Sequence, residues 1–365
     1  MFSATDKDYM AQALRLAEQG LYTTDPNPRV GCVLVKDGAI VGQGFHHKAG
    51  GAHAEILALR QAGEKARGAS VYVTLEPCTH VGRTGPCADA LVEAGVARVI
   101  VAMADPNPKA GRGLEKLSAA GIETSVGLMD AEAGALNPGF ISRMTRGQPW
   151  VRSKLAVSLD GRTALASGMS KWISGAAARE DAQHWRARSS AILTGIGTLL
   201  ADDPALTVRL PGEWRQPRRI VLDTQLRTPS HARLLQLPGE TLVATGVVDA
   251  TRHAALKAAG ARILVLPMAG GHLDLTALMH QLSDLECNEV LVEAGAALNG
   301  ALLRAGLLDE LIIYMAPQLL GDSARGMFEL PALDSLEERV ELRLKDVRML
   351  GMDVRFLALP HARSS

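Results

Sequence analysis

The sequence predicts an α/β protein built from two domains. Short apolar runs typical of strands alternate with stretches of about ten residues that end at glycine, which is the pattern of βα units on a largely parallel sheet. A chain of 365 residues is too long for one ordinary domain and suits two. Proline and glycine gather between Asn137 and Pro149, so we place a boundary there and expect domains over 1–147 and 148–365.

The expected elements of the first domain follow one another closely. Thr5 is expected to cap a first helix that Gly20 ends, and a hairpin is expected to turn at Lys36-Asp37-Gly38. The expected strands are 30–35, 39–44, 70–75 and 97–103, and the later helices are 53–62, 86–94 and 113–120.

The second domain shows the same alternation over a longer stretch. Its expected strands are 151–157, 191–194, 219–223, 241–244, 263–266, 289–293 and 310–315, with helices between several of them. Residues 340–344 and 354–359 are expected to close the sheet as an antiparallel pair.

Composition argues against several classes of function. Lys plus Arg equals Asp plus Glu at 39 each, and aromatic residues make up 4%, so the basic, ring-lined groove of a nucleic-acid binder is not expected. A small substrate with one phosphate needs only a few local cations and fits this balance. Four cysteines are too few for a secreted disulfide scaffold, and Cys32 and Cys287 are expected to be buried. With no membrane-spanning run, we expect a cytoplasmic protein without a membrane partner.

One histidine and two cysteines carry the chemistry expected of the first domain. His53 opens a helix, Cys78 follows the strand at 70–75, and Cys87 opens the next helix after Pro86. Ligands at strand ends and helix starts converge at one edge of an α/β sheet, and a helix start also favours a thiolate. One imidazole and two thiolates leave a fourth zinc position open for water, as in a catalytic zinc site.

Glu55 lies two residues after His53 and is expected to move protons. Residues two apart face different directions on a helix, so the carboxylate approaches the metal-bound water from another side than the imidazole. Loss of an amino group from a heteroaromatic ring needs an activated water, and zinc lowers the pKa of its bound water to about 7. A general base must then carry the proton to the ring nitrogen and the leaving amine. The pattern therefore indicates hydrolysis of a C–N bond.

The motif around His53-Ala54-Glu55 and Pro77-Cys78 resembles the cytidine deaminase superfamily, whose pattern is H-x-E followed by P-C-x-x-C. Here eight residues instead of two separate Cys78 from Cys87. That insert, with NPRVGC at 27–32 and DPNP at 105–108, resembles the RibD family of bifunctional riboflavin biosynthesis enzymes. Gly51-Ala52 and Gly85 depart from the family's frequent prolines, which loosens the loops but removes no ligand.

The second domain resembles the reductase half of the same family. The resemblance rests on KLAVSLDGR at 154–162, ADDPALTVR at 201–209 and VEAG at 292–295, so it extends over nearly the whole chain. Spacing alone is less decisive here, because glycines follow the strands at 191–194 and 289–293 without forming a G-x-G-x-x-G.

The resemblance implies two folds and two reactions. A cytidine-deaminase-like α/β/α domain would hold one zinc ion and deaminate 2,5-diamino-6-ribosylamino-4(3H)-pyrimidinone 5′-phosphate by hydrolysis. A dihydrofolate-reductase-like α/β domain would then use NADPH to reduce the ribosyl chain, giving 5-amino-6-(5-phosphoribitylamino)uracil. The family also implies a homo-oligomer, a dimer formed through the reductase domain, that binds no nucleic acid.

The resemblance also implies the site residues of both domains. In the deaminase, His53, Cys78 and Cys87 match the zinc ligands and Glu55 the catalytic proton carrier. Its substrate pocket matches Asn27, His46, His80, Arg83 and Asp105. The implied NADPH contacts are Ala156, Trp172, Thr198, Asp202, Gly295, Ala296, Ala297, Leu298, Asn299, Gly300 and Ala301. The implied reductase substrate contacts are Ser170, Arg186, Leu206, Arg209 and Glu293.

Three basic residues have a chemical reason to lie in the reductase substrate site. Arg186 and Arg209 suit a ribose phosphate, because a guanidinium can bind it with two hydrogen bonds. Lys154 lies among apolar residues of the first strand of this domain, and as a hypothesis it binds sugar hydroxyls or assists ring opening.

Two other functions compete with this interpretation. A zinc deaminase acting on a nucleic-acid base, with a binding module behind it, would be expected to carry more positive charge and more aromatic residues. A structural zinc clip joined to an oligomerisation domain would need a fourth ligand and would have no use for Glu55.

Overall fold

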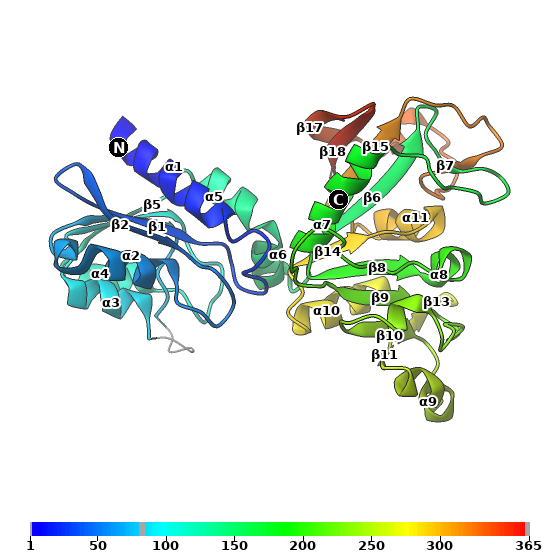
Figure 1. The fold of residues 1–365 in the computed structure, drawn as a ribbon, viewed down its shortest axis with the longest axis horizontal. Helices are drawn as coiled ribbons and strands as arrows, with labels where there is room; N and C mark the ends of the chain where they lie inside the picture. Colours follow the sequence, from blue (N-terminus) through cyan, green and yellow to red (C-terminus); the bar gives the residue numbers. More distant parts are fainter. Residues whose placement is uncertain (1, 80–84, 362–365) are drawn as a thin grey trace. The chain divides into compact units, whose positions relative to one another are not determined.

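The computed structural model describes residues 2–79 and 85–361 and divides into two compact units, residues 1–148 and 149–365 (Figure 1). Each unit contains its own sheet and its own buried core, so each is described by itself. None of the helices in the described ranges combines the length and the apolar character needed to cross a membrane.

The first unit is a three-layer α/β/α structure around a five-stranded sheet. In order across the sheet the strands are β2 (Ala39–Phe45), β1 (Gly31–Lys36), β3 (Ser70–Leu75), β4 (Arg98–Met103) and β5 (Glu123–Val126). Strand β1 runs antiparallel to β2 and β3, whereas β3, β4 and β5 are parallel. The carboxyl ends of the three parallel strands therefore share one edge.

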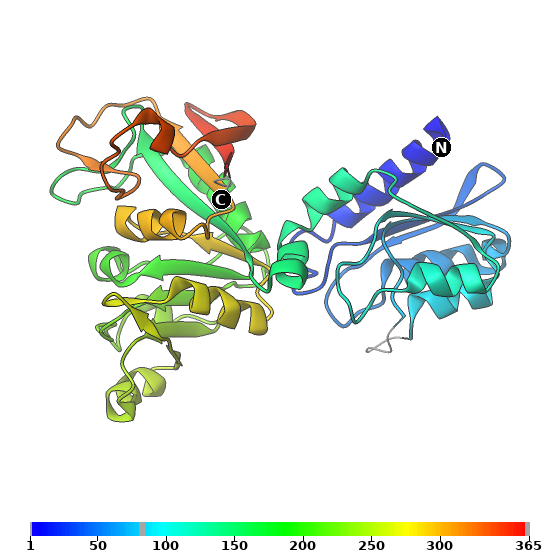
Figure 2. The same ribbon diagram turned by 180° about the vertical axis from the view of Figure 1, so that it is seen from behind.

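Helices cover both faces of this sheet (Figure 2). The helices α1 (Ala4–Glu18) and α5 (Asp130–Leu136) pack on one face, and α2 (Ala54–Ala62), α3 (Cys87–Ala94) and α4 (Gly113–Ala119) on the other. Helix α6 (Pro138–Arg146) follows α5, and a short 3-10 turn occupies Gly63–Ala66.

Helix α1 begins two residues before the expected position, with Ser3 as its cap, so the predicted cap at Thr5 is wrong. The Ser3 hydroxyl accepts a hydrogen bond from the backbone N–H of Asp6, and the Asp6 carboxylate accepts one from the N–H of Ser3. This reciprocal pair satisfies two donors at the helix start, whereas a single Thr cap satisfies one.

Glycines on β2 let α2 lie unusually close to the sheet. A Cβ on Gly42 would come within 2.2 Å of the Ala58 carbonyl oxygen, and one on Gly44 within 2.8 Å of the Ala54 carbonyl oxygen. The facing side of α2 carries small buried residues, including Ala58 and Ala62. Close packing of these small residues fixes where the amino end of α2 lies, and that end carries His53 and Glu55.

The second unit contains a nine-stranded mixed sheet. In order its strands are β11 (Ala261–Val265), β10 (Thr241–Thr245), β9 (Arg218–Leu222), β8 (Ala191–Gly195), β14 (Glu289–Val292), β6 (Trp150–Ser158), β15 (Glu310–Ala316), β18 (Asp353–Pro360) and β17 (Leu342–Leu350). All neighbours from β11 to β15 are parallel, and the last two strands are antiparallel.

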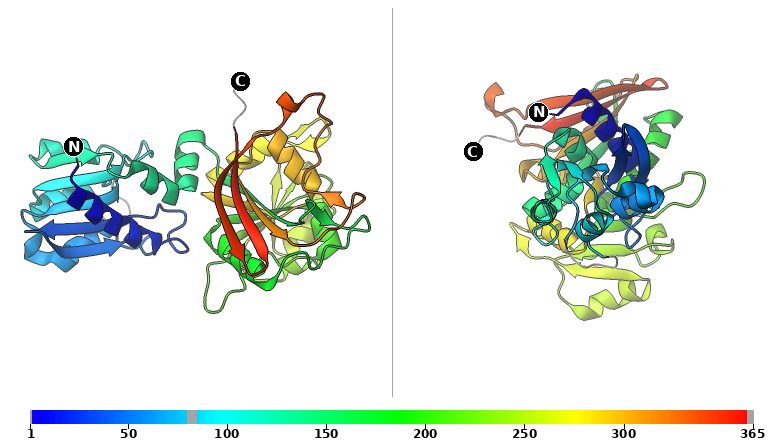
Figure 3. Two further views of the ribbon diagram at one scale, coloured as in Figure 1. Left: turned by 90° about the horizontal axis from the view of Figure 1, so that it is seen from above. Right: turned by 90° about the vertical axis from the view of Figure 1, so that its left-hand side faces the viewer.

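Two cores lie on the two faces of this sheet. One includes α10 (Leu275–Asp284) and α11 (Ala296–Arg304), and the other includes α7 (Ala176–Arg188), α8 (Ile196–Asp202) and α9 (Ala250–Ala258). The long β17–β18 hairpin at the edge of the sheet is drawn in red in Figure 3. The short elements are β7 (Arg162–Ala164) with β16 (Arg325–Gly326), β12 (Met268–Ala269) with β13 (His272–Leu273), and 3-10 turns at Arg233–Leu235 and Leu336–Glu338.

The close contact between β2 and α2 predicts the effect of one small substitution. Gly42→Ala should lower the free energy of unfolding by about 1–3 kcal/mol, because the added methyl group forces α2 away from the sheet. Chemical denaturation would measure the change. Gly85→Ala is the matched control, since its Cβ would meet no atom within 4 Å. Equal stability of the two variants would contradict the packing argument.

Candidate functional site

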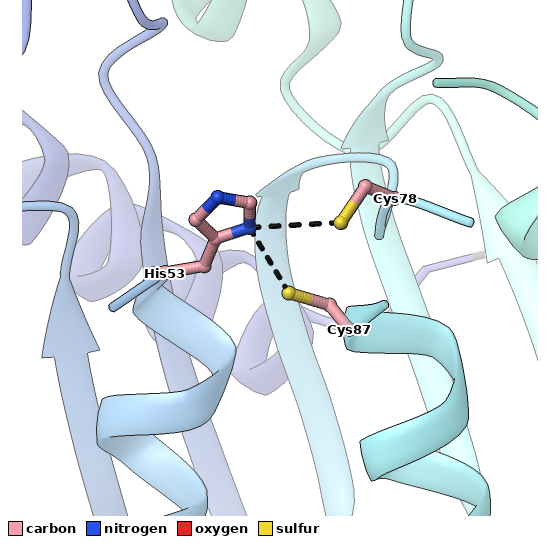
Figure 4. A group of neighbouring side chains, drawn as sticks. All are labelled: His53, Cys78 and Cys87. Carbon is pink, nitrogen blue, oxygen red and sulfur yellow. Dashed lines mark hydrogen bonds between the residues drawn. The ribbon is translucent and has the colours of Figure 1, made fainter. Parts of the chain in front are cut away.

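His53, Cys78 and Cys87 converge at the carboxyl edge of the first sheet (Figure 4). His53 is the residue before α2, Cys78 follows β3, and Cys87 is the first residue of α3. The His53 Nδ1 atom lies 3.2 Å from the Cys87 sulfur and 3.6 Å from the Cys78 sulfur. Tetrahedral zinc with nitrogen and sulfur ligands needs ligand atoms roughly 3.5–3.8 Å apart. The three side chains therefore fit a zinc ion with one position left for water.

The protonation of the two thiols supports the same assignment. A hydrogen bond from Cys87 lowers the pKa of Cys78 to about 4, and the same bond raises the pKa of Cys87. A hydrogen bond to Cys78 raises the pKa of His53. One thiolate is thus already favoured, and a divalent cation at the same point would stabilise both.

Glu55 lies in the first turn of α2, where its side chain is buried beside Cys87. Burial raises the pKa of Glu55, chiefly because its charged form has lost water. A carboxyl with a raised pKa next to an activated water can both take and return a proton. This is the position predicted for a proton carrier.

His46 and Asn27 lie next to the His53 ring. The His46 Nδ1 atom lies 3.1 Å from the Ala52 carbonyl oxygen, which assigns its proton to Nδ1. Its Nε2 atom lies 3.1 Å from the Asn27 amide nitrogen, which then donates to it. The His46 and His53 rings meet edge to face at 5.4 Å, and burial lowers the pKa of His46. Two of the predicted pocket residues are therefore brought to the metal position.

Asp105 is joined to the loop that carries Cys78 by hydrogen bonds to Glu76, a residue that the sequence analysis did not single out. The Glu76 carboxylate accepts hydrogen bonds from the N–H groups of Asp105 (3.2 Å) and Leu114 (3.0 Å). The Thr79 hydroxyl also donates to the Gly111 carbonyl oxygen at 2.9 Å. These bonds hold residues 105–114 against the loop that carries Cys78. The other two predicted pocket residues, His80 and Arg83, lie outside the described residues.

In the second unit, four predicted substrate residues form one charged cluster at the end of β14. Arg186 donates to both oxygens of Glu293, from Nε at 2.6 Å and from Nη2 at 2.8 Å. The charges of Arg186, Lys154 and Arg209 lower the pKa of Glu293 to about 2, although burial acts in the opposite direction as the largest single influence. Burial lowers the pKa of Lys154, which Glu293 partly opposes.

The two remaining predicted substrate residues differ in their setting. Leu206 is buried with a φ of 48°, a strained backbone conformation for leucine. Ser170 is half-buried in the segment after β7. Tyr314, not predicted from the sequence, places its ring 6.0 Å from the Lys154 Nζ atom and donates to Asp181 at 2.6 Å.

Four of the predicted NADPH contacts belong to segments that follow or form β6 and β8. They are Ala156, Trp172, Thr198 and Asp202. Thr198 and Asp202 belong to α8, and the Lys171 amine lies 3.4 Å from the Asp202 carboxylate. Trp172 is 72% exposed, and the Arg179 guanidinium lies 4.7 Å from its ring. Ala156 on β6 pairs with Tyr314. Because the Trp172 ring is exposed, it is available to stack against a flat ligand.

The glycine-led segment 295–301 is the residue before α11 followed by the first six residues of that helix. Asn299 is fully buried, where it accepts a hydrogen bond from the Ser153 hydroxyl at 2.7 Å and donates to the Ala294 carbonyl oxygen. A Cβ on Gly300 would come within 2.1 Å of the Glu329 carbonyl oxygen. These two residues hold α11 in place, while Gly295 and Ala297 are more accessible.

Comparisons with known proteins agree with this arrangement. Residues 3–103 match the cytidine and deoxycytidylate deaminase zinc-binding region, and residues 149–356 match the RibD C-terminal domain. The riboflavin biosynthesis protein RibD of Escherichia coli is 54% identical, over 96% of this chain and 98% of that protein. That of Haemophilus influenzae is 49% identical, over 98% of both.

Solved structures show the same relationship. Acinetobacter baumannii RibD matches with a TM-score of 0.91 at 47% identity, over 98% of this chain and 99% of that one. A Thermotoga maritima protein, described as a diaminohydroxyphosphoribosylaminopyrimidine deaminase and 5-amino-6-(5-phosphoribosylamino)uracil reductase, matches with a TM-score of 0.86 at 31% identity, over the same shares. These matches confirm the predicted α/β fold class, with a cytidine-deaminase-like first unit and a reductase second unit.

The convergence of two thiols predicts a specific loss of metal. Cys87→Ser should lower the bound zinc from about one ion per chain to well below one, because two ligands and a hydroxyl bind zinc weakly. Elemental analysis after dialysis against a weak chelator would measure this. Cys287→Ser is the matched control, since Cys287 is an equally buried cysteine without a disulfide in the other unit. Equal zinc loss from both variants would count against the site.

Proposed function

The chain belongs to the RibD family, and we propose that it performs two consecutive reactions of riboflavin biosynthesis. Residues 1–147 deaminate 2,5-diamino-6-ribosylamino-4(3H)-pyrimidinone 5′-phosphate, and residues 148–365 then use NADPH to reduce the ribosyl chain of the product. The observation that carries the proposal is the convergence of His53, Cys78, Cys87 and Glu55 in a chain that also carries the reductase domain.

Deamination requires a nucleophile, a proton carrier and a pocket that orients the ring. A zinc ion held by His53, Cys78 and Cys87 supplies an activated water when bound. Glu55 takes the proton of that water, holds it as a neutral carboxylic acid, which its raised pKa favours, and gives it to the pyrimidine. Asn27 and His46 form one wall beside His53 and supply hydrogen-bonding groups for the substrate.

Reduction requires a fixed sugar phosphate next to a hydride donor. Three guanidinium nitrogens of Arg186 already bond to Glu293 and to the Thr207 carbonyl oxygen, so Arg186 mainly orients Glu293. Arg209 is exposed beside them, and we assign it to the phosphate. Lys154 lies within this cluster with a lowered pKa, so its amine can bind or protonate the ribosyl oxygen as the ring opens.

A stepwise assay tests the whole proposal. The zinc-loaded protein is incubated with the diaminopyrimidine ribotide, ammonia is measured, and NADPH is then added while its absorbance is followed. We expect ammonia release and then NADPH oxidation. Ammonia released only from RNA or DNA would instead indicate a nucleic-acid deaminase, and no turnover of either substrate would indicate a structural zinc site.

The two reactions should be separable by single substitutions. Glu55→Gln should lower ammonia release by about 10²–10⁴-fold, because the proton carrier is lost, and should leave zinc content and NADPH oxidation with the deaminated substrate unchanged. Lys154→Met should have the opposite effect, lowering NADPH oxidation and sparing ammonia release. If either variant lost both activities, the substitution would have disturbed folding rather than one site. That result would contradict the separate roles assigned to Glu55 and Lys154.

We also propose that the second unit forms a homodimer through β17. A bulge between Leu344 and Asp346 places four apolar side chains of β17 on one face of the hairpin. Of these Leu344, Val347 and Met349 are each more than half exposed. Their partners on β18 include Phe356 and Ala358, which belong to the core on that face. A face that continues the core but remains exposed is typical of a subunit interface, and a second copy would cover it.

The dimer proposal predicts a change in mass. Val347→Glu should shift the protein toward monomer, because a charge would be buried in an apolar interface. Light scattering after size-exclusion chromatography would measure the shift. Val248→Glu is the control, since Val248 is 79% exposed and lies before α9. An unchanged mass for Val347→Glu would exclude this face from the interface.

We place the protein in the cytoplasm on chemical grounds. None of the four cysteines forms a disulfide, and two of them must stay reduced to bind zinc. A reducing compartment maintains that state.

A further inference from the structure

The Lys154 amine lies in the reductase cluster beside an aromatic ring. Among the residues that the structure describes, none forms a hydrogen bond or an ion pair with this amine. The centre of the Tyr314 ring lies 6.0 Å from its Nζ atom. A lysine side chain is a flexible stem that loses entropy when it is ordered, so an amine that acts on a substrate gains from a surface that limits its movement. The Tyr314 ring is such a surface.

The register of the sheet brings this ring to Lys154. Tyr314 of β15 pairs with Ala156 of β6, and Lys154 lies two residues earlier on the same face of β6. The small side chain of Ala156 leaves room beside the ring. Tyr314 is completely buried, whereas Lys154 is half-buried. A substrate in the cluster can therefore reach the amine but not the ring, so any effect of Tyr314 on the reaction must pass through Lys154.

Asp181 of α7 holds the Tyr314 ring in place. The Tyr314 hydroxyl donates to the Asp181 carboxylate at 2.6 Å. Arg355, which pairs with Tyr314 from β18, donates from Nη1 to both oxygens of Asp181 at 2.9 and 3.0 Å. The Trp185 indole donates to the same carboxylate at 3.2 Å. The carboxylate is thus fixed from three directions, and the ring cannot turn away without breaking a hydrogen bond to a charged acceptor.

The ring also acts on the charge of Lys154. Burial lowers the pKa of Lys154, and repulsion by Arg186 of α7 adds to that effect. Glu293, at the end of β14, raises the pKa by attraction, and Arg209 lies in the same cluster next to Glu293. The face of an aromatic ring attracts an ammonium group. Tyr314 therefore favours the charged amine against the desolvation that burial causes.

We propose that Tyr314 and Asp181 are positioning residues of the reductase site. The Asp181 carboxylate fixes the Tyr314 hydroxyl, and the Tyr314 ring holds the Lys154 amine where it meets the ribosyl oxygen. Tyr314 acts through Lys154, and Asp181 acts through Tyr314. The inference rests on the proposed reduction and adds two residues on which the action of Lys154 depends.

The main test measures NADPH oxidation by the full-length protein, with the deaminated substrate, as a function of pH. Tyr314→Leu should lower kcat by about 3- to 30-fold, because the amine loses the ring beneath it. The alkaline limb of the kcat profile should also move to lower pH by roughly 0.4–1.5 pH units, because the ammonium form is less favoured. Tyr314→Phe keeps the ring and should leave this limb near its wild-type position.

Ile313→Ala is the matched control for a cavity in the core. Ile313 is the neighbour of Tyr314 on β15, but it belongs to the core on the other face of the sheet. Its truncation should lower stability and leave the alkaline limb unchanged, since no charged group near Lys154 is altered. A limb that moves in Tyr314→Leu but not in Ile313→Ala separates positioning from a general loss of packing.

A second test asks whether Asp181 acts through the Tyr314 hydroxyl. Asp181→Asn should lower kcat by about 3- to 10-fold in the wild-type chain, because a hydrogen bond to a charged acceptor becomes one to a neutral acceptor. In a chain that already carries Tyr314→Phe the same change should have little further effect, because the hydroxyl that joins the two residues is gone. An equal fall in both chains would overturn the role assigned to Asp181.

The remaining outcomes separate this inference from the proposal beneath it. An alkaline limb that Tyr314→Leu leaves in place, or that Tyr314→Phe moves just as far, overturns the inference. If Tyr314→Leu does not fold, as thermal melting would show, the comparison of Asp181→Asn in the two chains decides. If the wild-type protein oxidises no NADPH, the proposed reduction fails. Acetylation of Lys154 at several pH values, read by mass spectrometry, then decides alone, and the pKa of Lys154 should be lower in Tyr314→Leu than in the wild type.

Discussion

The chemistry of this chain depends on the edge at which its parallel strands end. In the first unit Cys78 follows β3, and His53 and Cys87 enter at the starts of the helices on the same face. In the second unit Glu293 follows β14. At a carboxyl edge each strand releases its chain into a loop, so side chains from distant segments meet without interrupting the sheet. A zinc site and a dinucleotide site can therefore arise from the same structural rule.

Charge burial in the second unit explains why its site is rigid. The Glu293 side chain is 14% exposed, and its carboxylate is stabilised as an anion because Arg186 binds both of its oxygens. An ion pair of this kind, largely removed from water, contributes little net stability. Loss of one partner is nevertheless destabilising, because the other charge is left without a partner and with little water around it. A second buried network joins Arg152 to Glu289 and Glu310 between β6, β14 and β15. These pairs join β6 and β14, which position Lys154 and Glu293 of the substrate cluster, to the neighbouring strand β15.

The sequence was a good guide to the elements whose patterns are local. Strand β3 has the expected bounds, and most other expected strands are shifted by two residues at most. The strand expected at 340–344 instead runs from Leu342 to Leu350, because Lys345, Asp346 and Arg348 lie on an edge strand where polar residues are tolerated. The cap of α1 was misplaced because Ser3 and Thr5 are both good caps, and only the pairing with Asp6 distinguishes them.

The candidate site residues also differ in how readily the sequence predicts them, again according to whether the pattern is local. The sequence could bring the three candidate zinc ligands together because short motifs carry them within 35 residues, and the structure places these side chains at one point. Glu76 was missed because its role is to accept backbone N–H bonds from a loop about thirty residues away, and no local pattern records such a contact.

The two sites also differ in how they are assembled, and this difference bears on how the activities can vary independently. His53 and Cys87, with Cys78 between them, come from one continuous segment that closes on a single point, so the metal site is complete within a few adjacent elements. The reductase cluster joins Lys154, Arg186 and Glu293 across more than one hundred residues and three separate elements. A change in the packing of the second sheet would therefore reach the reductase cluster through several strands, whereas the zinc site depends mainly on how closely α2 and α3 lie against β3. Because each unit has its own core, damage to one site need not be transmitted to the other.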